Sequence, residues 1–166
     1  MAEAPDTNPD TKRQMLRHTL ATLAYRGLKA LSNVPDGFAD FRVNETTRTP
    51  GEILAHISDL LDWALELAKG EHKFHESPSL PWEDGVARFV AALEAFDSYL
   101  ASDEPLGFRD EKLFQGPVAD ALTHVGQIAM LRRMAGGAVR GENYFKADII
   151  AGRVGAEQAE PRFEFD

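Results

Sequence analysis

An aspartate and a histidine lie four residues apart in an otherwise largely apolar stretch, residues 116–137. This stretch has Pro117 in its first turn and ends at a Gly-Gly pair, so it predicts one complete helix. Asp120 and His124 fall on one row of that helix, at the spacing that lets two side chains hold one ion. Because most of the remaining circumference is apolar, the helix should be largely buried, and buried ionisable groups must be paired, hydrogen-bonded or bound to metal. Two interpretations follow: a local Asp–His hydrogen bond at a helix contact, or part of a metal site.

A third candidate, His56, lies in a second predicted helix, residues 49–70. Thr49, Pro50 and Glu52 fit the N-cap, first and third positions of this helix, which is the pattern of a capping box with proline in the first turn. His56 lies at the margin of the apolar stripe and should therefore face other helices rather than water. A lone histidine there is usually a hydrogen-bonded core residue, so His56 alone does not indicate a site.

Four stretches of about twenty residues carry the apolar period of an α-helix, and no stretch predicts a convincing strand. They span residues 11–31, 49–70, 82–101 and 117–136. Four amphipathic helices of similar length predict an all-α protein built as a four-helix bundle. The stretch 103–116, which contains Pro105 and Gly107, is expected to be a loop before the last helix.

The chain divides by composition into three parts. Residues 1–10, with two prolines and three acids, predict a disordered leader without the apolar segment of a signal peptide. Residues 11–137 form the predicted bundle, and residues 138–166, rich in glycine, should be a C-terminal tail that wraps the bundle. Asn143 is expected to cap a short helix over residues 144–150.

Composition excludes several classes of function. Lys plus Arg is 18 and Asp plus Glu is 27, which gives a net charge of −9 and no general attraction for nucleic acid or an anionic membrane. No apolar run is long enough to span a bilayer. The chain has no cysteine, so disulfides, thiolate metal sites and a cysteine nucleophile are excluded, and thiol chemistry would need a thiol from outside. We interpret the chain as cytoplasmic.

A histidine on the second helix and the Asp-x-x-x-His pair on the fourth can converge if those helices face each other. Two imidazoles and one carboxylate suit Zn²⁺, Ni²⁺, Fe²⁺ or Mn²⁺, and ligand type alone does not choose among these metals. Three protein ligands also leave positions open for water or substrate, as in catalytic rather than structural sites. The other histidines, His18, His72 and His75, are expected to be solvated.

Two motifs, TPGEILAHI at 49–57 and THVGQIAMLRR at 123–133, resemble those of the DinB/YfiT-like superfamily of metal-binding four-helix bundles. The resemblance covers nearly the whole chain, and the tail sequence GENYFKADIIAGRVG looks like that of an uncharacterised subset of the family. Family members typically have one histidine in the first motif and two more in a second motif, H-x-x-x-H-x-G-Q. Carried over by position, these ligands are His56, Asp120 and His124. The chain departs from the pattern at Asp120, where the family usually has histidine.

The resemblance implies an up-down-down-up bundle that often dimerises. It also implies a metal-dependent transferase or isomerase that joins a low-molecular-weight thiol, such as bacillithiol, mycothiol or glutathione, to an electrophilic small molecule. Its partners would be that thiol, that electrophile and a second copy of the chain, and Arg132 and Arg133 are expected near the dimer face. The substituted Asp120 keeps an alternative open: a non-catalytic metal-binding or dimeric stress-related bundle whose site has drifted.

Ligating histidines usually have their second ring nitrogen held by an acceptor. Glu52 and Gln127 are the expected acceptors for the two site histidines. Tyr144 and Asp148 are expected to position substrate if the tail folds over the mouth of the site.

Overall fold

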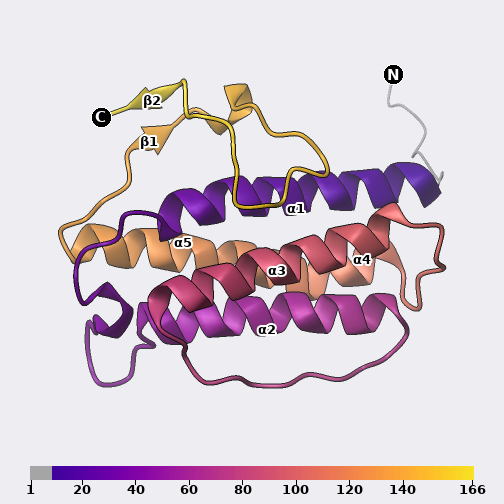
Figure 1. Cartoon of the computed structure of the whole chain (residues 1–166), viewed down its shortest axis with the longest axis horizontal. Helices are drawn as coiled ribbons and strands as arrows, with labels where there is room; N and C mark the ends of the chain where they lie inside the picture. The colour runs from indigo at the N-terminus through magenta and orange to yellow at the C-terminus, as the bar shows by residue number, and fades with distance from the viewer. Residues whose placement is uncertain (1–8) are drawn as a thin grey trace.

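The computed structural model describes residues 9–166, so residues 1–8 of the expected leader lie outside it. The chain is mostly helical, at 58%, with four long helices and little strand, which confirms the predicted all-α class. The long helices are α1 (Pro9–Leu31), α2 (Pro50–Ala68), α3 (Trp82–Ala101) and α5 (Ala119–Met134). They lie side by side with connections at their ends, as Figure 1 shows. No helix within the described residues is both long and apolar enough to cross a membrane.

The last helical segment begins earlier than predicted. A short helix α4 (Asp110–Leu113) and a π-helical turn η2 (Phe114–Val118) lead directly into α5. Pro117 lies inside this turn rather than at the start of a helix. Proline has no N–H to donate and its ring disturbs the regular hydrogen-bond ladder, and a π turn is one way for a helix to continue past it. The predicted loop 103–116 therefore ends at Arg109.

The core fills the space between the four long helices. Leucine, isoleucine and phenylalanine side chains from all four are fully buried there, among them Leu20, Ile57, Phe89, Phe96 and Ile128. Their spacing follows the predicted apolar stripes, so packing of these faces fixes how the helices are turned about their own axes. That rotation decides which polar side chains face one another at the margins of the core.

The segment after α5 lies along α1, on the side away from α2 (Figure 1). It contains the two-residue strands β1 (Gly141–Glu142) and β2 (Glu164–Phe165), which pair antiparallel, and a 3₁₀ turn η3 (Tyr144–Lys146). The short helix predicted over residues 144–150 is wrong beyond this one turn. The predicted cap is also wrong, because the Asn143 side chain makes no capping hydrogen bond.

Arg132 closes the C-terminal end of α1 from within. Its side chain is buried, at 5% exposure, and it donates hydrogen bonds to the backbone carbonyls of Ala30, Ser32 and Asn33 and to Gly137. The last carbonyls of a helix have no partner within the helix, and a cation there also suits the helix dipole. The expectation that Arg132 lies on an exposed dimer face is therefore wrong, whereas Arg133 is exposed.

Candidate metal centre

The start of α2 sets the position of His56. Thr49 accepts a hydrogen bond from the Glu52 backbone N–H at 3.2 Å, and the Glu52 carboxylate accepts one from the Thr49 N–H at 2.7 Å. With Pro50 as the first helical residue, this is the predicted capping box, and the structure confirms it. His56 follows one turn after Glu52, with 17% of its side chain exposed.

The first two turns of α5 carry the other two candidate ligands. Asp120 lies in the first turn with 47% of its side chain exposed, and His124 lies one turn later with 11% exposed. The His124 Nδ1 atom lies 2.8 Å from the backbone carbonyl oxygen of Asp120. A carbonyl oxygen can only accept, so Nδ1 carries a proton, and in the neutral imidazole Nε2 then has its lone pair free. The fold thus fixes the tautomer that leaves Nε2 available to a metal.

The three predicted ligands converge from two helices. His56 Nε2 lies 3.7 Å from Asp120 Oδ2, and the two imidazole ring centroids are 4.7 Å apart. One potential ligand atom from each of the three residues lies within 4.8 Å of the other two. Ligand bonds of about 2.0–2.2 Å place two ligand atoms of one ion at most about 4.4 Å apart, and the spread of this cluster exceeds that limit by no more than a few tenths of an ångström. The cluster could hold one metal ion, and its donor set fits a divalent one.

The alternative interpretation is a local hydrogen bond between Asp120 and His124. Such a bond exists, but it involves a different group of Asp120 from its side chain. The hydrogen bond that exists joins His124 to the backbone of Asp120, not to its carboxylate. The carboxylate oxygens lie 3.3 Å from His124 Nδ1 and 3.7 Å from His56 Nε2, distances at which a hydrogen bond is weak or absent. Among the described residues, the carboxylate accepts only one long hydrogen bond, from Thr123 Oγ1 at 3.4 Å. Most of its acceptor capacity therefore remains available.

The electrostatic surroundings favour a neutral His56. Burial lowers the pKa of this imidazole most, and the neighbouring His124 and Arg48 lower it further, while Asp120 and Asp59 act in the opposite direction. Removal from water disfavours the charged form of a histidine, and a nearby cation does the same. His56 is therefore held in the form that can coordinate a metal at neutral pH.

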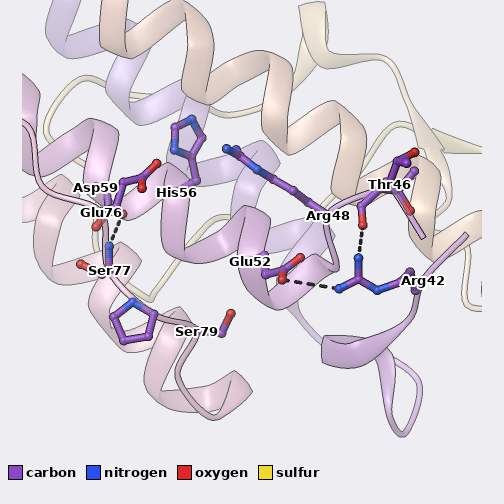
Figure 2. Close-up of a pocket in the computed structure, with 11 residues that line it drawn as sticks. Arg42, Thr46, Arg48, Glu52, His56, Asp59, Glu76, Ser77 and Ser79 are labelled. Atoms are coloured by element: carbon purple, nitrogen blue, oxygen red, sulfur yellow. Dashed lines mark hydrogen bonds and ion pairs between the residues drawn. The ribbon is translucent and has the colours of Figure 1, made fainter. Parts of the chain in front are cut away.

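A cavity of about 610 Å³ opens beside His56. It is lined by the loop that precedes α2, by the first turns of α2 and by residues 76–79 of the loop between α2 and α3. Figure 2 shows Arg48 extended along this cavity, with its guanidinium end next to the imidazole of His56. Arg48 is not among the predicted site residues; its only signal in the sequence is its position immediately before the N-cap of the helix that carries His56.

Aromatic side chains cover another side of His56. The Phe74 ring makes an edge contact with the His56 ring at 6.2 Å between centroids and with Trp63 at 5.7 Å. Phe74 thus packs against a candidate ligand while staying 40% exposed, although the neighbouring His72 and His75 are solvated as expected. The Trp63 indole nitrogen is buried and has no hydrogen-bond partner among the described residues. No periodic signal in a loop could have placed Phe74 here.

The expected acceptors for the second ring nitrogens are wrong. Glu52 is engaged in the capping box and with Arg42, so it does not hold His56. The acceptor for His124 is the Asp120 carbonyl rather than Gln127, whose side chain is exposed. A side chain committed to the end of its helix cannot also reach one turn further along it.

Two further expected residues lie elsewhere. Tyr144 packs against Tyr25 and Arg26 on α1, and Asp148 pairs with Arg153, so neither is placed at the site. The tail lies along α1, on the side away from α2 (Figure 1), and none of its residues lines the cavity beside His56. The three remaining histidines, at positions 18, 72 and 75, are exposed and outside the cluster.

Comparison with known protein families, with curated proteins and with solved structures gave no match for this chain. The geometry of the centre and of its cavity therefore carries the functional argument.

Proposed function

We propose that this protein holds a divalent metal ion at His56, Asp120 and His124 and transfers a low-molecular-weight thiol to an electrophilic small molecule. The observation that carries the proposal is the convergence of these three side chains, with potential ligand atoms within 4.8 Å of one another, beside an open cavity. Three protein ligands leave room for a small molecule, which is the arrangement of a catalytic site.

Membership of the DinB/YfiT-like superfamily, with its up-down-down-up bundle, is part of the same proposal. Its support is that the two motifs that carry the resemblance are the ones that bring their ligands together, His56 from α2 and His124 from α5. The homodimer and the cytoplasmic location that we infer from the sequence also belong to this proposal.

Each residue around such a site would have its own role. A bound divalent ion would supply the positive charge that lowers the pKa of a thiol to the point where the thiolate forms near neutral pH. The Asp120 carbonyl orients His124, burial keeps His56 neutral, and Phe74 covers the His56 ring. Since the chain has no cysteine, the thiol comes from solution.

The reaction is a simple displacement. The thiol loses its proton to solvent, its sulfur forms a bond to the electrophilic carbon, and the leaving group departs with the electron pair of its bond to that carbon. In an isomerase, the same thiol adds to its substrate and is later released unchanged. The metal is one of Zn²⁺, Ni²⁺, Fe²⁺ and Mn²⁺, which share this donor set.

The half-exposed Asp120 in a position where histidine is usual favours a second candidate, a metal-binding bundle without catalysis. Both candidates predict metal binding, and only the first predicts that a thiol is consumed. The two are therefore separated by activity and not by metal content.

The test is metal analysis of protein purified without a histidine tag, followed by a conjugation assay. We expect about one ion per chain in the wild type and none in His56→Ala, because two remaining ligands rarely hold an ion against buffer. The loaded wild type should then conjugate glutathione, mycothiol or bacillithiol to 1-chloro-2,4-dinitrobenzene faster than His56→Ala does. A wild type that takes up none of the four metals would overturn the proposal, and metal uptake without any thiol consumption would leave the non-catalytic candidate.

A further inference from the structure

We propose that Arg48 binds an anionic group, a carboxylate or a phosphate, on the small molecule that enters the site formed by His56, Asp120 and His124. This inference rests on the proposed function and specifies the class of its substrate. Its basis is the position of Arg48 in the cavity beside His56, with its guanidinium end next to that imidazole (Figure 2).

The backbone on both sides of Arg48 is fixed. On one side, the Asn44 side chain accepts hydrogen bonds from the backbone N–H groups of Thr46 and Thr47, which closes a tight turn. On the other side, Thr49 is the N-cap of α2 and is locked by the capping box. An arginine held between two such anchors loses little further backbone freedom when it binds a ligand, which favours binding.

The guanidinium of Arg48 has no partner among the described residues, in contrast to Arg42 and Asp59 on the same cavity wall. Arg42 donates to the Thr47 carbonyl and to Glu52, and Asp59 accepts from Arg88 at 2.6 Å. Arg48 makes no hydrogen bond or ion pair with any residue that the structure describes, including Glu76 on the same cavity wall. Arg48 is exposed and lines the cavity, so its N–H donors have no acceptor among the described residues and can bind a ligand.

A positive charge beside a metal site weakens metal binding, and a bound anion compensates it. Arg48 and a divalent ion at the three ligands would repel each other, which weakens metal binding as long as both are unscreened. An anion bound by Arg48 removes this repulsion. The guanidinium fork is shaped to accept two oxygens of one carboxylate or phosphate, and such charge-assisted pairs are stronger than neutral hydrogen bonds.

The inference makes a reciprocal prediction. If the anion relieves repulsion at the metal site, then anion binding must tighten metal binding by the same factor by which metal tightens anion binding. Without an anion, Arg48→Gln should bind metal at least as tightly as the wild type, because the repulsive charge is gone.

The experiment is calorimetric titration of zinc-loaded protein with three probes. 3-Mercaptopropionate carries a thiol and a carboxylate, 2-mercaptoethanol carries a thiol without an anion, and inorganic phosphate carries an anion without a thiol. We expect the wild type to bind 3-mercaptopropionate at least about tenfold more tightly than 2-mercaptoethanol, and Arg48→Gln to lose that preference. Arg48→Lys should keep only part of it, because lysine retains the charge and loses the fork.

Arg133→Gln is the matched control. It removes the same charge from an exposed arginine at the end of α5 and should behave as the wild type does. Phosphate that binds the wild type and not Arg48→Gln would support the inference with phosphate as the source of the anion. A preference for 3-mercaptopropionate that depends on Arg48 would support it with a carboxylate on the thiol.

The anion site at Arg48 and the metal site can be disproved separately. Equal affinities of wild type and Arg48→Gln for all three probes, with zinc bound to both, would overturn this inference and leave the proposed metal site intact. Failure of the wild type to bind zinc, nickel, iron or manganese would overturn the proposed function and this inference with it.

Discussion

Glu142 in the C-terminal segment and Asp120 in α5 are both carboxylates placed among side chains from other elements, and they differ in how completely they are satisfied. The Glu142 side chain is fully buried, at 0% exposure. It accepts hydrogen bonds from the Tyr25 hydroxyl at 2.6 Å and from Lys29 Nζ at 2.7 Å, both on α1. Lys29 also forms an ion pair with Glu164 at 2.9 Å, so the buried Glu142 carboxylate belongs to a fully paired network.

Asp120 is half exposed and has no comparable partner. Its carboxylate lies near His56 and His124 at distances longer than a good hydrogen bond, while the nearby Arg48 forms no ion pair with a described residue. Of the three candidate ligands, His56 lines the cavity.

The contrast separates a polar cluster that holds the fold from one that is free to bind. A satisfied buried network has no capacity left for a ligand, and removing one member leaves an uncompensated charge inside the protein. A cluster with unused lone pairs and an unpaired guanidinium loses little stability when altered, but it loses whatever it binds. The predictions that follow test this division.

The largest effect should come from Glu142→Ala. This change leaves Lys29 partly buried with only Glu164 as partner and the Tyr25 hydroxyl without its acceptor, and breaking a buried pair costs about 3–5 kcal/mol. Urea unfolding would measure the loss in free energy. Glu160→Ala, an exposed acid in the same segment, should stay within about 0.5 kcal/mol of the wild type. Metal content should be the same in both variants, and a Glu142→Ala protein as stable as the control would contradict the structural role.

His56→Ala should show the opposite pattern. The metal-free variant should be nearly as stable as the wild type, whereas the stabilisation that metal gives should vanish. For the wild type, an ion present at about one hundred times its dissociation constant adds about 2.7 kcal/mol to the free energy of unfolding. Urea unfolding with zinc and with chelator measures this difference, and His18→Ala, at an exposed histidine outside the cluster, serves as control. A zinc-dependent gain that survives in His56→Ala would remove His56 from the ligand set.

Asp120→His should tighten metal binding at neutral pH, because it restores three imidazoles while the backbone carbonyl of residue 120 still holds His124 Nδ1. We expect about a tenfold gain in affinity, which corresponds to about 1.4 kcal/mol. Asp120→Asn should weaken binding, since an amide is a poorer ligand than a carboxylate or an imidazole for these metals. Competition with a coloured chelator measures both. If Asp120→His remains without metal, the site is vestigial.

The parts of the structure that local patterns control were predictable from the sequence. The apolar periods located the four long helices, and the Thr49, Pro50 and Glu52 pattern located the start of α2. These features depend on residues within a few positions of one another. The three candidate ligands could be named for a related reason: each sits at a fixed place on a helix whose buried face was known.

What the sequence did not reveal depends on distant contacts or on backbone irregularity. Phe74 reaches His56 from a loop with no period, and Arg132 ends in a pocket made by the last carbonyls of α1. Proline normally ends a helix, but at Pro117 the helical segment continues through a π turn, which the sequence pattern does not indicate. The place of Arg48 beside His56 could not be predicted, because it depends on how the loop before α2 folds along the cavity.

The smallest expected effect is on the pH dependence of stability, and it concerns the cluster of His56, Asp120 and His124. Burial lowers the pKa of His56 in the folded protein below its value of about 6.5 in the unfolded chain. The unfolded state therefore binds the proton more readily, so stability should fall as pH decreases from about 6.5 toward the folded-state pKa, and level off below it. Urea unfolding in chelator at about pH 7.5 and about pH 5.5 should show a larger loss in the free energy of unfolding for the wild type than for His56→Gln.

His75→Gln, at an exposed histidine, should lose as much free energy of unfolding as the wild type between these two pH values. Equal losses in all three proteins would contradict the lowered pKa of His56. Arg48→Gln should lose less than the wild type, because the Arg48 charge is one cause of the shift, and this links the pH dependence to the cation that we propose receives the anion.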